Sequence, residues 1–148
     1  MEDRWMFLLF LLIAAVQDIK RKSVEVRVYA VFGTLAILTI GYQWAAKGQA
    51  VDWSSLFCSL CLGFGLLGCG MLWRDAVGLG DGCFFLVSGL MLGFWENLAL
   101  LCYGMLLCSI YCLGLLVWKQ VRYRQNVRKC TVPFLPFLVP VGIWMVCR

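Results

Sequence analysis

Residues 98–118 read LALLCYGMLLCSIYCLGLLVW and contain no Asp, Glu, Lys or Arg. A helix needs about 20 consecutive apolar residues to cross the hydrocarbon core of a bilayer, so this stretch predicts a transmembrane helix. Residues 28–46 and 56–73 are similar in character and also carry no charge. Three shorter apolar runs, at residues 5–16, 83–95 and 132–147, span a membrane if polar end residues extend the helix or the bilayer thins locally.

The composition of the whole chain agrees with this pattern. Of its 148 residues, 63% are hydrophobic and only 14% are charged, whereas soluble domains average about 25% charged residues. An ordinary soluble domain is thereby excluded. We expect an all-α, polytopic membrane protein with about six transmembrane helices, forming a single transmembrane domain over residues 1–148.

The basic residues predict the orientation of this bundle. Ten of the thirteen lysines and arginines fall in three connections, at residues 17–27, 74–82 and 119–130. The other three are Arg4, Lys47 and Arg148. Because basic residues concentrate on the cytoplasmic side, we expect the three connections in the cytoplasm and both termini outside.

Nothing in the sequence predicts a nucleic-acid site, a metal site or an organic cofactor. The basic residues of 119–129 lie between two apolar runs, where topology and contact with anionic lipid headgroups account for them. Nine cysteines are present but no histidine. The pair Cys58-x-x-Cys61 has no second pair, which argues against zinc, and the cysteines within apolar runs are interpreted as small packing residues.

Two aspartates lie at the edges of apolar runs, where they are candidates for function. Asp18 follows the first run, and Asp81 opens the fourth within the stretch Gly78-Leu79-Gly80-Asp81-Gly82. A carboxylate near the hydrocarbon is costly, so such residues are functional candidates by default. The predicted topology brings both to the same membrane face.

A pair of carboxyls is the arrangement that peptide hydrolysis needs. One ionised carboxylate accepts a proton from water while a protonated partner donates a hydrogen bond to the scissile carbonyl. Two neighbouring carboxyls share one proton, because like charges disfavour double ionisation. Gly78, Gly80 and Gly82 are expected to allow close backbone approach and positive φ beside Asp81, whose carboxylate the helix dipole favours.

Structural explanations of the same aspartates remain open. Asp18 is alternatively an interfacial residue paired with Lys20 or Lys22, and Asp81 an ordinary helix N-cap. Asp75 competes with Asp81 for the second catalytic role, although an ion pair with the neighbouring arginine explains it better.

Taken together, three motifs resemble those of the type IV prepilin peptidases, which are membrane aspartyl proteases. Residues 18–24, DIKRKSV, are similar to the family's aspartate, basic stretch and apolar residue after an early span. Residues 78–81, GLGD, are similar to its Gly-x-Gly-Asp motif, and residues 132–138, VPFLPFL, to the start of its last span. The resemblance extends from residue 5 to about residue 145.

The resemblance implies that Asp18 and Asp81 are the catalytic pair and that Gly78 and Gly80 shape the active-site loop. Pro133 and Pro136 are carried over as structural residues, which we expect to give irregular backbone beside the site. The chain departs from the family at two positions. Glu25 replaces a usual proline, and Cys83 replaces a usual lysine.

The two-domain members of the family carry a cytoplasmic segment with paired cysteines. This sequence shows no such segment, so it resembles the small, peptidase-only members. The resemblance implies cleavage of a prepilin or pseudopilin precursor at the cytoplasmic face, usually after glycine, without metal or organic cofactor. The alternative is a non-catalytic membrane subunit or small transporter whose aspartates are structural or carry protons. The sequence indicates no particular oligomeric state.

Overall fold

The structure is a computed structural model that describes residues 2–21, 25–47, 52–72, 78–123 and 134–147. Every element in these ranges is a helix, which confirms the all-α prediction. In chain order the helices are α1 (Glu2–Arg21), α2 (Val26–Lys47), α3 (Trp53–Leu72), α4 (Leu79–Leu92), α5 (Phe94–Tyr123) and α6 (Leu135–Cys147).

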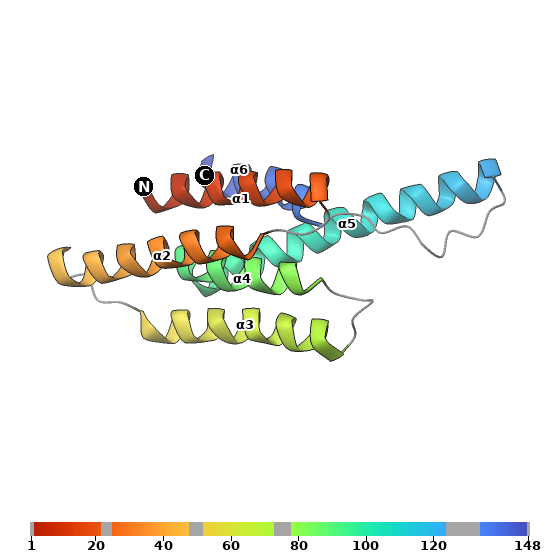
Figure 1. The fold of residues 1–148 in the computed structure, drawn as a ribbon. Helices are drawn as coiled ribbons and strands as arrows, with labels where there is room; N and C mark the ends of the chain where they lie inside the picture. Colours follow the sequence, from red (N-terminus) through yellow and green to blue (C-terminus); the bar gives the residue numbers. More distant parts are fainter. Residues whose placement is uncertain (1, 22–24, 48–51, 73–77, 124–133, 148) are drawn as a thin grey trace.

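The helices run up and down along a common axis, so both termini lie at the same end of the bundle (Figure 1). Helices α1 and α6 lie on one side and α3 lies on the opposite side. Helix α4 is central, because it contacts α1, α2, α3 and α5. The C-terminal part of α5 extends beyond the other helices at the end away from the termini (Figure 1).

Helix α1 buries one face and exposes the other. Phe7, Phe10, Leu11 and Ala14 are completely buried, and their spacing of three or four residues places them on one side of the helix. Leu9, Leu12 and Val16 are about half exposed on the other side. Apolar residues on both faces are typical of a helix that packs against protein on one side and contacts lipid on the other.

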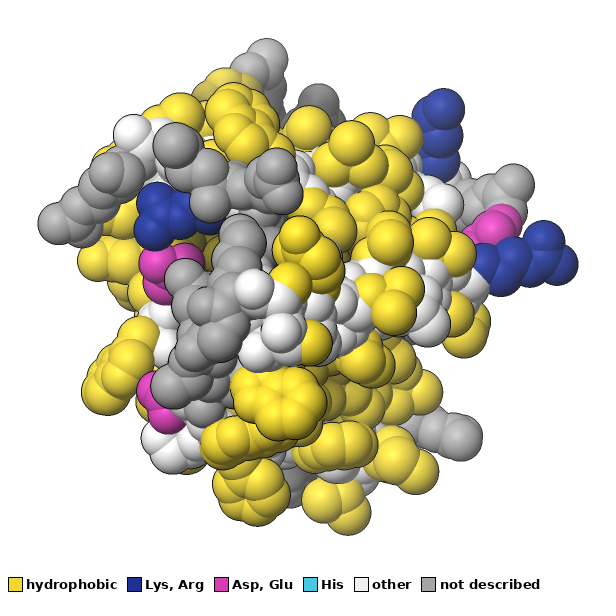
Figure 2. Space-filling model, turned by 90° about the vertical axis from the view of Figure 1, so that its left-hand side faces the viewer, with side chains coloured by type: hydrophobic (Ala, Val, Ile, Leu, Met, Phe, Trp, Pro, Cys, Tyr) yellow, Lys and Arg dark blue, Asp and Glu magenta, His cyan; other side chains and the backbone are white. Residues whose placement is uncertain are grey.

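Three helices are long and apolar enough to cross a membrane, namely residues Val26–Ala46, Trp53–Leu72 and Phe94–Trp118. They contain the three charge-free stretches predicted from the sequence, apart from residue 73, which lies outside the described part. Large hydrophobic side chains are widely exposed, and they cover most of the face seen in Figure 2. Burial of such a surface in lipid removes it from water.

The remaining three helices are described, but their crossing of the membrane stays a prediction. Helix α1 has 20 residues because polar residues extend the apolar run at both ends. Helices α4 and α6 have 14 and 13 residues, which at 1.5 Å per residue corresponds to about 20 Å, shorter than a typical hydrocarbon core.

Helices α3 and α4 approach each other closely through glycine. A side chain at Gly82 would collide with Leu67 of α3, reaching its backbone nitrogen at 2.9 Å, and one at Gly63 would collide with Leu86 of α4. Small residues allow this packing between membrane helices. The expectation of positive φ beside Asp81 is wrong, because Gly93 is the one glycine with positive φ in the described ranges.

A buried polar cluster joins α3, α4 and α5 at the end of the bundle that carries the termini. The Asn97 amide donates to the Ser59 hydroxyl at 3.2 Å and to the Phe85 carbonyl at 3.0 Å. Its carbonyl oxygen accepts from the Ser88 hydroxyl at 2.7 Å. Ser59, Ser88 and Asn97 are at most 1% exposed, so the cluster is neutral, buried and satisfied.

The structure tests one of the two prolines that were expected to give irregular backbone, Pro136. Pro136 lies in the first turn of the helix, where a missing N–H is tolerated because first-turn N–H groups have no partner in the helix. The expected irregular backbone at Pro136 is therefore wrong. Pro133 lies outside the described residues, and Pro140 lies inside the helix.

Candidate active site

Asp18 lies in the last turn of α1, on the face that the helix buries. It follows the buried Ala14 by four residues and is itself half-buried. Its Oδ2 accepts a hydrogen bond from the backbone N–H of Leu135 at 3.2 Å. Leu135 begins α6, whose first N–H groups have no acceptor within the helix, so a carboxylate from α1 caps α6.

This contact bears on the structural explanation proposed for Asp18, which was an ion pair with Lys20 or Lys22. In the part of the chain that the structure describes, Asp18 forms no ion pair with Lys20, and Lys22 lies outside that part. The carboxylate is turned toward the helix bundle and the start of α6. An interfacial ion pair with Lys20 is therefore wrong.

Asp81 lies in the first turn of α4, three residues after the N-cap residue. The N-cap is Gly78, which has extended backbone (φ −69°, ψ 131°) and makes no side-chain capping bond. The N–H of Asp81 donates to the Gly78 carbonyl at 3.0 Å. The interpretation of Asp81 as an ordinary N-cap is therefore wrong.

The helical spacing of α4 directs Asp81 toward the interior. Phe84, Phe85 and Ser88 follow it by three, four and seven residues and are completely buried or nearly so, so all share one face. Gly80 is already helical and Gly78 is the cap, so the motif forms a helix start rather than a free loop.

The two carboxyls interact electrostatically across the helices that carry them. Burial, and after it the charge of Asp18, raise the pKa of Asp81 to about 6, while a hydrogen bond from the Gly78 backbone acts in the opposite direction. Burial also raises the pKa of Asp18, partly offset by hydrogen bonds from the backbone of Leu135 and Phe134. Both residues lie outside the three long apolar spans.

Tyr29 of α2 lies at the same place and was missed by the sequence reasoning. Its hydroxyl donates to the Gly80 carbonyl at 2.8 Å, its side chain is only 8% exposed, and the charges of Asp81 and Asp18 act on it. The sequence did offer one signal, which is a tyrosine in the first turn of a predicted span at the membrane face of the aspartates. Such a tyrosine indicates a polar contact, because a buried phenol hydroxyl needs a hydrogen-bond partner.

The two departures from the family motifs lie near this site. The backbone N–H of Glu25 donates to the Gln17 side chain of α1 at 3.1 Å. Cys83 is half-buried in α4, near the Tyr29 hydroxyl. Asp75 lies outside the described residues.

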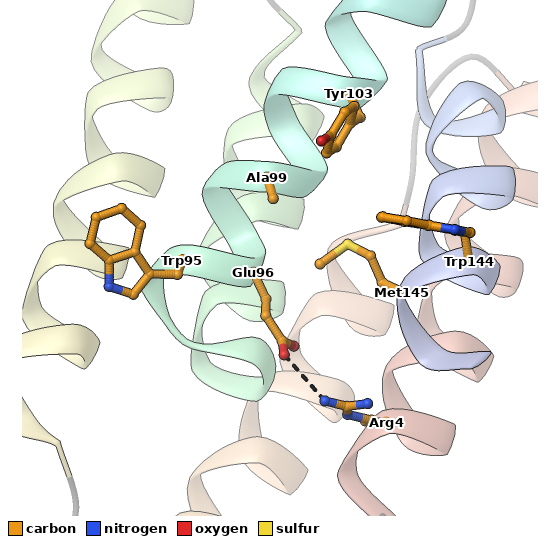
Figure 3. A pocket seen from close by; sticks show the side chains of 7 residues that line it. All are labelled: Arg4, Trp95, Glu96, Ala99, Tyr103, Trp144 and Met145. Atoms are coloured by element: carbon orange, nitrogen blue, oxygen red, sulfur yellow. Dashed lines mark hydrogen bonds and ion pairs between the residues drawn. The ribbon is translucent and has the colours of Figure 1, made fainter. Parts of the chain in front are cut away.

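A hollow of about 420 Å³ lies at the opposite end of the bundle. Glu96 of α5 forms an ion pair there with Arg4 of α1, with an N···O distance of 3.3 Å, and Figure 3 shows the side chains that line the hollow. Its other lining residues are Trp95, Ala99, Tyr103, Trp144 and Met145. These residues come from the starts of α1 and α5 and the end of α6, so the hollow is separate from the aspartates.

The carboxyls and thiols of the chain are the side chains from which a ligand set for a metal ion would be built. Within the described ranges, no group of three or more Cys, Asp or Glu side chains is placed to hold one. The chemistry available at Asp18 and Asp81 is that of two interacting carboxyls, which hold and transfer protons.

The fold and the site define a helical membrane protein with two interior-facing carboxyls near one end of the bundle. Residues 5–113 match the type IV leader peptidase family, and the chain belongs to this family. Membership implies a protease with a type IV leader peptidase-like function. Asp18, Tyr29 and Asp81 lie within the matched span, whereas residues 132–138 lie outside it. No curated protein and no solved structure gave a significant match.

Proposed function

We propose that this protein is an aspartic endopeptidase in which Asp18 and Asp81 remove the leader peptide of type IV prepilin-like precursors at the cytoplasmic face. The observation that carries the proposal is the position of two half-buried carboxyls at the adjoining ends of two contacting helices, the last turn of α1 and the first turn of α4, where burial raises the pKa of both. Membership of the leader peptidase family supports the reaction class and favours it over the transporter and non-catalytic alternatives.

The proposed reaction uses the single proton that the two carboxyls share. The ionised carboxylate accepts a proton from water as the water oxygen attacks the scissile carbonyl carbon. The protonated carboxyl gives its proton to the carbonyl oxygen, which yields a tetrahedral diol. When the diol collapses, the ionised carboxylate takes a proton from one diol hydroxyl as the C=O bond re-forms. The C–N bond breaks, and the amine leaves with the proton of the other carboxyl, so the pair again holds one proton.

The hydrogen bonds of the two aspartates favour one distribution of this proton. Backbone N–H groups of Leu135 and Phe134 both stabilise the ionised form of Asp18, whereas Asp81 has one such bond, from Gly78. The shared proton therefore resides mainly on Asp81, with Asp18 as the base in the first step. The apparent pKa values still belong to the pair.

The apolar surface of the bundle suits a substrate that is itself a membrane helix. Exposed apolar side chains of α1, including Val16 and Ile19, lie beside Asp18. A precursor whose apolar segment follows the cleavage site can lie in the bilayer against such a surface while its leader remains in water. This arrangement brings the scissile bond to the membrane edge.

The cleavage assay uses the detergent-solubilised protein and a precursor with a basic leader, a final glycine and about twenty apolar residues. Mass spectrometry is expected to detect the free leader, cut after the glycine. A matched precursor with leucine in place of that glycine serves as the control. Release of the same leader by the double variant Asp18→Asn, Asp81→Asn would refute the proposed pair.

The cytoplasmic location is tested separately by labelling cells with a membrane-impermeant thiol reagent. The charge distribution predicts that a cysteine introduced at Asp52 is labelled from outside, whereas Cys130 is not. Asp52 is exposed at the start of α3, and Cys130 lies outside the described residues. The reverse labelling pattern would place the aspartates on the external face.

A further inference from the structure

The peptide unit that joins Gly80 to Asp81 is held on both of its sides. Its carbonyl oxygen accepts the Tyr29 hydroxyl at 2.8 Å, and its N–H donates to the Gly78 carbonyl at 3.0 Å. A peptide unit is planar, so two bonds on opposite edges fix its orientation. The Cα of Asp81 is part of this unit, and the starting direction of the Asp81 side chain is fixed with it.

The hydroxyl of Tyr29 adds to the bonding of α4 without competing with it. A carbonyl oxygen has two lone pairs, so Gly80 can accept the tyrosine while it also serves the helix. The phenol lies directly against this part of the backbone, because a Cβ at Gly80 would be in ordinary van der Waals contact with the Tyr29 oxygen, at 3.5 Å.

The ring of Tyr29 is held by the same helix that carries Asp18. Phe10 of α1 contacts Tyr29 edge-on, with ring centroids 6.2 Å apart. Phe10 also stacks on Phe84 of α4 at 5.0 Å. The aromatic contacts thus connect the three helices that supply Asp18, Tyr29 and Asp81, and they leave the phenol few other orientations.

We propose that Tyr29 is a positioning residue, which holds the Gly80–Asp81 peptide unit so that the Asp81 carboxyl stays directed toward Asp18. The inference rests on the proposed function and assigns a role to a residue that the motifs leave out. The groups that act electrostatically on its hydroxyl are Asp18 from α1 together with Asp81 and Cys83 from α4. Tyr29 acts through Asp81 and is not itself assigned a bond to the substrate.

The test compares Tyr29→Phe, which keeps the ring and removes the hydroxyl, with Tyr42→Phe. Tyr42 is on the same helix but 64% exposed, so it is a matched control. For Tyr29→Phe we expect kcat for the glycine-containing precursor to fall about 10- to 100-fold, the scale of a small misplacement of a catalytic group. KM and the melting temperature are expected to stay close to those of the parent.

Two further readouts separate positioning from general support of the fold. With the carboxyls farther apart, the two limbs of the pH–rate profile are expected to move closer together, since like-charge coupling weakens with distance. Incorporation of 3-fluorotyrosine at position 29 restores a hydroxyl donor and is expected to restore kcat. Tyr42→Phe is expected to change neither quantity.

The outcomes distinguish this inference from the proposed function. If Tyr29→Phe cleaves as fast as Tyr42→Phe while Asp81→Asn is inactive, the proposed function stands and the role of Tyr29 is refuted. Loss of activity that is matched by a loss of melting temperature and is not restored by 3-fluorotyrosine would also refute it. If the parent cleaves no precursor, the proposed function fails and the inference fails with it.

Discussion

Two polar clusters connect the helices of this bundle, and they are built on opposite principles. The cluster of Ser59, Ser88 and Asn97 is uncharged, and each of its side chains is hydrogen-bonded and almost fully buried. The cluster of Asp18 and Asp81 contains two acidic groups, each of which disfavours the ionisation of the other, and it is only partly buried. The first lies toward the end with the termini, and the second toward the opposite end.

The difference indicates what each cluster contributes. A satisfied neutral network fixes the register of packed helices, because any shift leaves a buried donor or acceptor without a partner. Two carboxyls that repel each other make folding less favourable and are retained where their protonation is used. We interpret the Asn97 cluster as structural and the aspartate pair as functional.

The largest effect is expected from removing one charge of the pair. Asp18→Asn and Asp81→Asn should each lower precursor cleavage by about 10²- to 10⁴-fold, because the acid and base roles depend on each other. Unfolding should be unaffected or slightly harder, since a repulsion is removed. Initial cleavage rates and thermal melting of the purified variants measure both quantities.

Asp52→Asn is the matched control for these two variants. Asp52 directly precedes α3, and its side chain accepts hydrogen bonds from Ser54 and Ser55 in the first turn of that helix. Asparagine caps a helix N-terminus as well as aspartate does. Asp75→Asn should likewise retain most activity. Cleavage by Asp81→Asn together with loss of cleavage by Asp75→Asn would identify Asp75 as the true partner of Asp18.

The next effect concerns stability and comes from disturbing the neutral cluster. A methyl group at Gly89 would collide with Ser59 and lie 2.9 Å from the Asn97 amide nitrogen, so Gly89→Ala should destabilise the fold by about 1–3 kcal/mol. The folded fraction should retain its kcat. Detergent-based unfolding measurements and active-site-normalised rates test this separation.

Gly65→Ala provides the comparison, because nothing lies within 4 Å of a Cβ at that position of α3. Its effect should be neutral or stabilising by up to about 1 kcal/mol through helix propensity. Equal destabilisation by both variants would mean that the close packing at Gly89 has no special energetic role. A lower kcat in Gly89→Ala alone would mean that the two clusters are coupled.

The sequence predicts the framework of this fold better than the contacts within it. Long apolar runs such as residues 28–46 are recognisable because the thickness of the bilayer requires their length. Asp18 and Asp81 are recognisable because each lies at the edge of an apolar run within a motif that resembles one of the family's. Their catalytic role stays a prediction, although the family to which the chain belongs is established.

The missed contacts depend on how each helix is rotated about its axis. The bond from Tyr29 to Gly80 and the bond from Leu135 to Asp18 join residues that are far apart in sequence. No local pattern specifies which helices become neighbours. Gly82 was expected to allow close backbone approach, but the sequence does not specify that the partner is Leu67 of α3.

The pH dependence of cleavage should separate the charged cluster from the neutral one. Burial and the charge of Asp18 raise the pKa of Asp81 to about 6, and burial raises that of Asp18. In the proposed mechanism the singly protonated pair is the active form, so the rate should fall about tenfold per pH unit above the upper limb as the shared proton is lost. On the acidic side the rate should fall as the second proton binds.

The sign of the stability effect follows from the same shift. Between about pH 4 and pH 6 folded Asp81 keeps a proton that an unfolded aspartate releases, so its contribution to stability is lost as pH rises through this window. That step should be absent from Asp81→Asn and present in Gly89→Ala. A cleavage rate that rises through one ionisation and then stays constant into alkaline solution would refute the shared proton.

The smallest effect is expected at the exposed ion pair between Arg4 and Glu96. Its N···O distance is 3.3 Å, and the two side chains are 44% and 42% exposed, so solvent and salt weaken the attraction. A double-mutant cycle with Arg4→Gln and Glu96→Gln should give a coupling energy of about 0.2–1 kcal/mol. The pair joins α1 to α5 at the end remote from Asp18, so cleavage rates should stay within about twofold.

A large loss of activity with little change in stability would show that a shift of α1 at this end is transmitted along the helix to Asp18. In that case the two ends of the bundle would not be independent, and the division into a structural end and a functional end would have to be abandoned.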